Sequence, residues 1–184
     1  MDVYFLLYDG FSGFEMMFPA FVFRNTHPKT VGEKKMIISE ENLHFMPDIL
    51  ISELDADKVD VLIIPGGSAL QHLKDGSEIQ DLLEKLHQKN KIIAAICGSP
   101  VLFANTSILE NKKFTAGYGE LPDHWQKNFT KGEYKNQDIV VDGNIITAKG
   151  VAVASFAVVI GKKVGLFKDE EEEERIFNII QEIR

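Results

Sequence analysis

The sequence predicts an α/β protein with a mostly parallel sheet that helices cover on both faces. Short apolar runs typical of buried strands alternate with segments of helical spacing. Turn-forming residues stand where three of these runs end, at Asp9-Gly10, Pro65-Gly66-Gly67 and Cys97-Gly98. No repeat, linker or low-complexity segment divides the chain, so we expect residues 1–184 to form a single domain.

The first half of the chain supplies two buried strands and one helix. Residues 3–8 form an apolar run that predicts the first strand, and residues 59–64 predict the second. Residues 14–24 carry apolar side chains at helical spacing. Between them, residues 34–40 and 43–52 predict short strands around a turn.

The second half continues the alternation of helices and strands. Residues 78–88 predict an amphipathic helix, residues 91–96 a buried strand, and the residues from Pro100 onward a further helix. Residues 112–116 predict a short strand, and residues 118–133 an irregular or helical segment.

The last third of the chain carries a hairpin and two helices. Residues 139–141 and 145–147 flank Asp142-Gly143-Asn144, a strong hairpin signal. Residues 151–165 predict a helix of small residues suited to close packing on a sheet. The acidic run 169–174 is typical of a solvated start to a last helix.

Cys97, the only cysteine, stands between an apolar strand and a helix-like segment. Such a turn lifts the side chain above the sheet edge in the geometry of a nucleophile elbow, with Cys in place of Ser. The helix dipole would favour thiolate, so we expect a lowered thiol pKa. Most lone cysteines are inert packing residues, but a packing cysteine belongs within a strand, whereas Cys97 ends one and precedes Gly98.

Two other features lie at predicted strand ends. Glu15 is either a solvated charge at a helix N-terminus or a partly buried carboxyl among apolar neighbours, and the sequence leaves both open. Gly66-Gly67 suits a loop that presents backbone N–H groups, although the pair alone is a weak signal. Because ligands bind beyond the carboxyl ends of parallel strands, one cleft could hold Glu15, Gly66-Gly67 and Cys97.

Composition excludes several classes of function. The net charge of −8 argues against binding to nucleic acid or to anionic membranes. The chain lacks both glycine patterns of nucleotide-binding loops. One cysteine permits no internal disulfide, and we find neither a basic leader nor an apolar run of roughly 20 residues. We therefore expect a soluble cytoplasmic protein without cofactor or metal.

Together these residues resemble the DJ-1/PfpI superfamily over nearly the whole chain. The resemblance is carried by Val61-Leu62-Ile63-Ile64-Pro65-Gly66-Gly67, by Ala94-Ala95-Ile96-Cys97-Gly98-Ser99-Pro100, by Glu15 four residues before Pro19, and by Ile145-Ile146-Thr147-Ala148-Lys149-Gly150. Each piece alone is loose, but their order and spacing are fairly specific.

The resemblance implies a flavodoxin-like three-layer sandwich with a nucleophile elbow, in the manner of glutamine amidotransferases, and a homodimer. It implies that Cys97 is the reactive cysteine and that Glu15 hydrogen-bonds to it. The backbone N–H groups of Gly67 and Gly98 would stand where the family binds an oxyanion. Gly66, Tyr118 and His124 are expected to line the pocket, although His124 with Trp125 more often would anchor a loop.

The chain departs from the family in its histidines. Many relatives carry one directly after the cysteine or at the end of the next strand, where this chain has Gly98 and about Gly117-Tyr118. Without that base, a Cys-His protease or an amidotransferase is not supported.

Two functions therefore remain. In the first, Cys97 attacks a small aldehyde, amide or isonitrile as a hydrolase or lyase, with Glu15 as proton donor and acceptor. In the second, the protein is a non-enzymatic sensor of oxidants or electrophiles in stress, in which Cys97 is oxidised to sulfinate.

Overall fold

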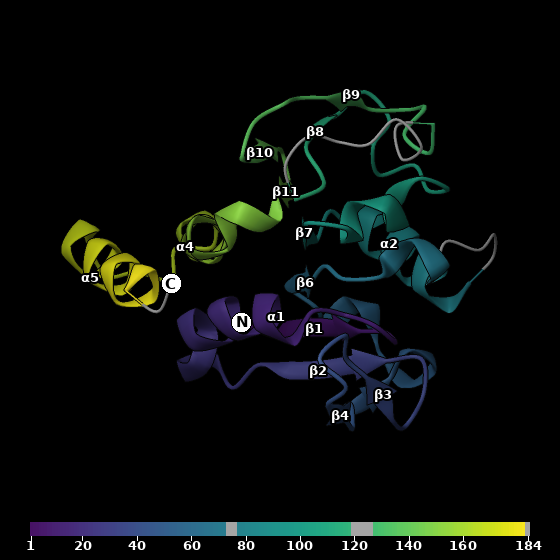
Figure 1. The fold of residues 1–184 in the computed structure, drawn as a ribbon, viewed down its shortest axis with the longest axis horizontal. Coiled ribbons are helices and arrows are strands. Elements are labelled where there is room, and N and C mark those ends of the chain that lie inside the picture. The colour runs from purple at the N-terminus through teal and green to yellow at the C-terminus, as the bar shows by residue number, and fades with distance from the viewer. Residues whose placement is uncertain (73–76, 119–126, 183–184) are drawn as a thin grey trace.

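The computed structural model describes residues 1–72, 77–118 and 127–182, and its centre is a seven-stranded sheet (Figure 1). The strand order is β10-β11-β7-β6-β1-β2-β5, and every neighbouring pair is parallel except β10 and β11. In chain order the strands are β1 Val3–Leu7, β2 Lys29–Gly32, β5 Ile49–Leu50, β6 Val61–Ile64, β7 Ile92–Ile96, β10 Ile139–Asp142 and β11 Ile145–Ala148.

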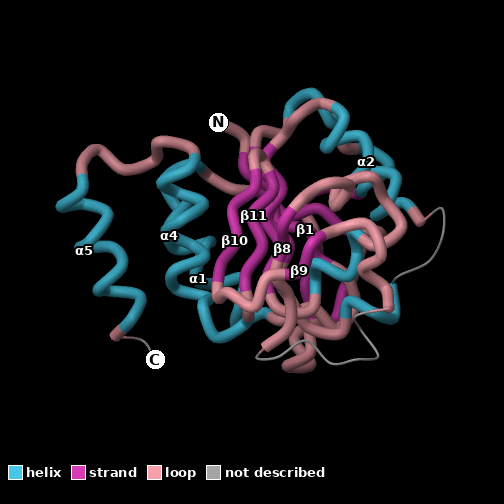
Figure 2. The backbone as a smooth tube through the Cα atoms, turned by 90° about the horizontal axis from the view of Figure 1, so that it is seen from above, coloured by secondary structure: helices cyan, strands magenta, loops and turns pink. Residues whose placement is uncertain are grey.

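Helices cover both faces of this sheet, which confirms the predicted α/β class. α1 (Gly13–Phe23) and α4 (Val153–Lys163) lie on one face, and α2 (Glu78–Gln88) lies on the other (Figure 2). α5 (Glu170–Gln181) packs on α4 and forms an outer layer beyond it. No helix in the described ranges is long and apolar enough to cross a membrane.

The central strands explain where the site lies. All residues of β1 and β6 are buried, as the continuous apolar runs of a sheet covered on both faces require. Phe5 of β1 pairs with Ile63 of β6, and Ile64 of β6 pairs with Ala95 of β7. The three strands therefore end side by side, and the loops that follow them meet at one edge of the sheet.

Several local predictions need correction. The strand β2 was not predicted, because only two of its four residues are buried. Residues 34–40 and 43–52 contain shorter strands, β3 (Ile37–Ile38) paired with β4 (His44–Phe45), and β5 at the sheet edge. Residues 112–116 contain β8 (Lys113–Phe114), whose parallel partner is β9 (Glu133–Tyr134).

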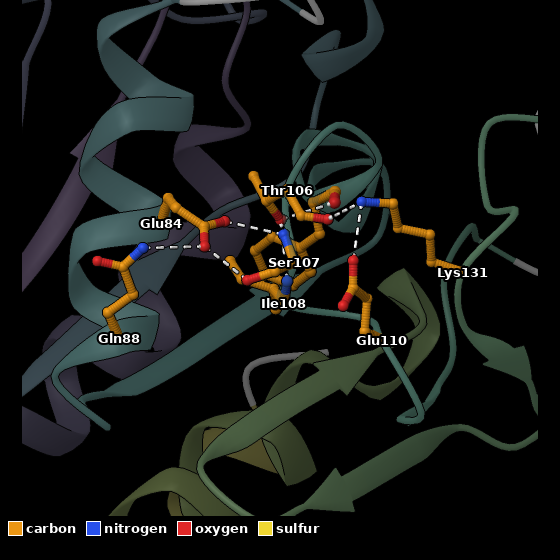
Figure 3. A network of polar contacts seen from close by, with 8 residues as sticks. Glu84, Gln88, Thr106, Ser107, Ile108, Glu110 and Lys131 are labelled. Atoms are coloured by element: carbon orange, nitrogen blue, oxygen red, sulfur yellow. Dashed lines mark hydrogen bonds and ion pairs between the residues drawn. The ribbon is translucent and has the colours of Figure 1, made fainter.

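The segment after Cys97 differs most from its prediction. In place of a helix of ordinary length, the chain forms a five-residue 3-10 helix, Ser99–Phe103, and then a series of turns. A polar network holds these turns in place (Figure 3). The carboxylate of Glu84 on α2 accepts hydrogen bonds from the N–H and hydroxyl of Ser107 at 2.8 and 2.6 Å. Nearby, Lys131 donates to the carbonyl of Thr106 and pairs with Glu110 at 3.0 Å.

Candidate active site

Cys97 stands at a sharp turn that the backbone holds in place. Its φ of 57° lies in the left-handed region, which is uncommon for any residue other than glycine. The Cys97 N–H donates to the carbonyl of Ala148 at 2.9 Å, and the Cys97 carbonyl accepts from Gly117 at 2.7 Å. The buried Ser99 hydroxyl donates toward the carbonyls of Ile64 and Ile96, so it ties the turn to β6 and β7.

Glu15 is a buried carboxyl beside this cysteine. Its side chain is placed by the first turn of α1, and the residue is 5% exposed. One carboxyl oxygen accepts a hydrogen bond from the Gly66 N–H at 2.7 Å, and the carboxyl lies beside the Cys97 thiol, whose interaction with it lowers the pKa of Glu15. Of the two interpretations that the sequence left open, the buried one is therefore right.

Two glycines leave room for this pair. A Cβ added at Gly66 would lie 2.3 Å from a carboxyl oxygen of Glu15 and 2.6 Å from the Cys97 Cβ. A Cβ at Gly150 would lie 3.0 Å from the other Glu15 oxygen and 3.1 Å from the Cys97 sulfur. Larger residues would displace the pair at both positions. Sequence reasoning missed Gly150 as a site residue, although it follows β11 at the edge where the other strands end.

The backbone N–H groups of Gly67 and Gly98 lie near the Cys97 sulfur and favour its charged form. Gly67 has a φ of 101°, and a Cβ there would lie 2.1 Å from the carbonyl oxygen of Gly10. Only glycine fits this position, because its backbone is packed directly against the loop that follows β1. The two N–H groups thus converge on one atom from loops that follow different strands.

Tyr8 holds the loop that contains Gly66 and Gly67, and it was not predicted as a site residue. Its buried hydroxyl lies 2.7 Å from the Pro65 carbonyl and 2.6 Å from the Gly66 carbonyl, to which it donates. Burial, followed by the charges of Glu15, Cys97 and Glu40, raises the pKa of Tyr8 well above its ordinary value. The hydroxyl therefore remains a donor and fixes the loop that presents the Gly66 N–H to Glu15.

The electrostatics of the pair differ from the sequence prediction. Burial raises the pKa of Glu15 from 4.5 to about 7, against the lowering effect of its hydrogen bonds to Gly66 and Cys97. Burial, with the neighbouring charge of Glu15, also raises the pKa of Cys97 to about 12, while the Gly98 and Gly67 N–H groups oppose the rise. The expected lowering of the thiol pKa is therefore wrong, since burial of the thiol outweighs what the five-residue 3-10 helix after it can contribute.

Because Glu15 and Cys97 each shift the pKa of the other, we treat them as one titrating unit. Below about pH 7 the pair holds two protons, and between about pH 7 and about 12 it holds one proton and one negative charge. The sulfur can carry that charge only while Glu15 keeps the proton. Reactivity of Cys97 should therefore follow the first proton loss of the pair.

The pair opens into a cleft of about 680 Å³. The described lining residues are Ser12, Phe14, Glu15, Glu40, Gly67, Ser68, Cys97, Tyr118, Gly150, Val151 and Val153. Tyr118 is exposed and lies over Gly150. The cleft thus brings together four predicted residues, Cys97, Glu15, Gly67 and Tyr118, while Gly66 and Gly98 contact the pair beside it.

The predicted histidine cannot be placed, since His124 lies outside the described residues. No histidine lines the cleft among the residues that are described. Within ranges 1–72, 77–118 and 127–182, no group of three His, Cys, Asp or Glu side chains is arranged to hold a metal ion.

Comparison with known proteins gives a consistent family. The family model described as DJ-1/PfpI family matches residues 1–162. "Uncharacterized protease YoaZ" of Bacillus subtilis is 35% identical over 145 residues, which are 75% of this chain and 66% of that protein, so the chain spans slightly less than two thirds of this relative's length. "Deglycase PfpI" of Pyrococcus furiosus is 24% identical over 152 residues, 81% of this chain and 90% of that protein.

Solved structures agree in fold. The DJ-1 superfamily protein Atu0886 of Agrobacterium tumefaciens superposes with a TM-score of 0.83 at 24% identity, and the match covers 100% of both chains.

Proposed function

The chain belongs to the DJ-1/PfpI family, and from this premise we propose that Cys97 acts as a nucleophile toward a small electrophile of the aldehyde, amide or isonitrile type. The observation that supports this most is the buried Glu15–Cys97 pair, which opens into a cleft and faces two backbone N–H groups. One domain, residues 1–184, carries this chemistry, and the name of the Pyrococcus furiosus relative, a deglycase, agrees with an aldehyde-type substrate.

With an aldehyde, the step is an addition. The Cys97 sulfur attacks the carbonyl carbon, a C–S bond forms, and the π electrons move to the oxygen. The Gly67 and Gly98 N–H groups stabilise the negative charge as it leaves the sulfur for that oxygen. Glu15 gives the oxygen its proton, and the product is a thiohemiacetal. Its raised pKa suits this exchange because an effective proton carrier titrates near the working pH.

Proteolysis of the Cys-His type is a weaker candidate, although one relative is named a protease. In the described part of the cleft no histidine stands near Cys97 to take its proton. Glu15 is the group that occupies that role here.

We further propose that the protein is a homodimer in a reducing, cytoplasmic compartment. Support comes from large apolar side chains left exposed on α1 and on the loops around β3 and β4, namely Phe14, Met17, Met36, Leu43 and Met46. A single thiol that serves as a nucleophile also needs a compartment that keeps it reduced.

The activity is tested by turnover of a panel of aldehydes, amides and isonitriles. We expect turnover of at least one class, and we expect Cys97→Ala to lose it by a factor of about 10³ or more, as for other nucleophile deletions. Equal turnover by the native protein and Cys97→Ala would exclude the proposal.

Oxidant sensing is the second candidate, because the same N–H groups and the Glu15 carboxyl suit a sulfinate. Mild peroxide should then add two oxygen atoms to Cys97, since the chain offers no second cysteine to form an internal disulfide. Intact mass after graded peroxide measures this. A disulfide between two chains as the main product would contradict it.

A further inference from the structure

Glu40 gives the cleft a charge that the proposed chemistry does not use. It lies in the connection between β3 and β4, and its backbone N–H donates to the carbonyl of Phe11 at 2.9 Å. Its side chain is exposed and lines the same cleft as Cys97. Among the residues that the structure describes, no ion pair or side-chain hydrogen bond involves the Glu40 carboxylate.

The neighbouring carboxylate of Glu41 is already engaged. Its two oxygens accept hydrogen bonds from the N–H groups of Gly13 and Phe14, at 3.1 and 3.0 Å, and so cap the start of α1. That contact holds the β3–β4 connection beside the helix that carries Glu15. Glu40 is therefore fixed at the cleft by its neighbour while its own charge stays unneutralised.

The cleft offers no compensating cation in its described part. Its charged lining residues are Glu15 and Glu40, both acidic. Lys149 directly precedes Gly150, which lines the cleft, but its ammonium group donates to Asn136 and does not line the cleft. The charge of Glu40 acts on Glu15 of the pair, whose pKa it raises together with the charge of Glu41, and it also raises the pKa of Tyr8.

We propose that the cleft selects its substrate by charge, and that Glu40 is the residue responsible. The favoured electrophile is cationic or uncharged, whereas one that carries a carboxylate, phosphate or sulfonate is repelled before its reacting carbon meets Cys97. This inference names a substrate class for the proposed activity and rests on that proposed function. The two N–H groups at the sulfur stabilise charge only at the reacting centre, so they do not offset repulsion elsewhere in the cleft.

The test uses three methanethiosulfonates that share one leaving group and carry an ethylammonium, an ethyl or an ethylsulfonate group. In each case the Cys97 thiolate attacks the sulfenyl sulfur, an S–S bond forms, and methanesulfinate leaves with the electron pair. Modification can occur only at Cys97, because the chain has no other cysteine. Each modification rate is divided by the rate of the same reagent with free cysteine, which removes intrinsic differences between the reagents. The ratio of the ammonium rate to the sulfonate rate is then compared between variants, because the fraction of Cys97 present as thiolate cancels within one variant.

For the native protein we expect the ammonium reagent to exceed the sulfonate by roughly tenfold at low salt. Glu40→Gln should reduce that ratio by about fivefold, and Glu40→Lys should reverse the preference. Glu174→Gln on α5 removes the same charge from an exposed site and should leave the ratio unchanged.

A native ratio near one, or a ratio that Glu40→Gln leaves unchanged, would overturn the role of Glu40. The uncharged reagent separately reports how reactive Cys97 is. A slow uncharged rate would count against the proposed function, while the ratio would still decide the selectivity.

Discussion

Glu15→Gln is expected to change the free energy of unfolding in a pH-dependent way. The difference between variant and native protein should be ~3 kcal/mol more favourable to the variant at pH 8 than at pH 4. The folded-state pKa of Glu15 is about 7, against 4.5 for an ordinary glutamate. A group whose pKa is raised on folding contributes stability below its unfolded pKa and loses it as pH rises through the folded pKa. The native protein therefore loses stability between pH 4.5 and about 7, and the glutamine variant does not.

The measurement is the free energy of unfolding by urea for both proteins at pH 4 and pH 8. Glutamine can keep the hydrogen bond from the Gly66 N–H, so the substitution removes the ionisable proton with little change in packing. Glu174→Gln, which removes an exposed carboxyl on α5, serves as the matched control. A native–variant difference that is the same at both pH values would mean that Glu15 is not a desolvated carboxyl.

A more stable glutamine variant at pH 8 would also show how much folding stability the buried Glu15 carboxyl removes. Burying a carboxyl beside a thiol is unfavourable at neutral pH, and a packed glutamine would be more stable. A residue that lowers stability where a neutral isostere would not is typical of a functional site.

The central strands could be predicted because burial on both faces leaves a continuous apolar run, as in residues 61–64. The positions of Cys97, Glu15 and the cleft could be predicted because ligands bind beyond the carboxyl ends of parallel strands. The strand β2 could not be predicted, because Lys29 and Thr30 are exposed or half-buried and carry no apolar pattern. The residues after Cys97 are nearly all apolar and fit a helix, but the backbone turns more tightly, and local spacing does not distinguish the two helix types.

The electrostatics of the site depended on three-dimensional packing. The thiol pKa was predicted in the wrong direction because its largest cause is burial, which no sequence spacing reports. Gly150 and Tyr8 were missed for a related reason. Their roles come from contacts with residues more than fifty positions away, at Cys97, Glu15, Pro65 and Gly66.

The account depends most on the claim that Glu15 and Cys97 form one titrating unit. In the native protein, alkylation of Cys97 by iodoacetamide should accelerate with a midpoint near pH 7, where the pair loses its first proton. Glu15→Leu leaves the thiol buried without a proton partner, so its midpoint should rise above the ~8.5 of an ordinary thiol. Glu15→Gln still donates a hydrogen bond to the thiolate and should keep the midpoint below that of the leucine variant.

The most direct test is therefore the rate of Cys97 alkylation against pH in Glu15→Leu and in the native protein. We predict an upward shift of the midpoint of more than about one pH unit. A midpoint that falls, or that stays where the native protein has it, would contradict the shared proton and remove Glu15 from the site.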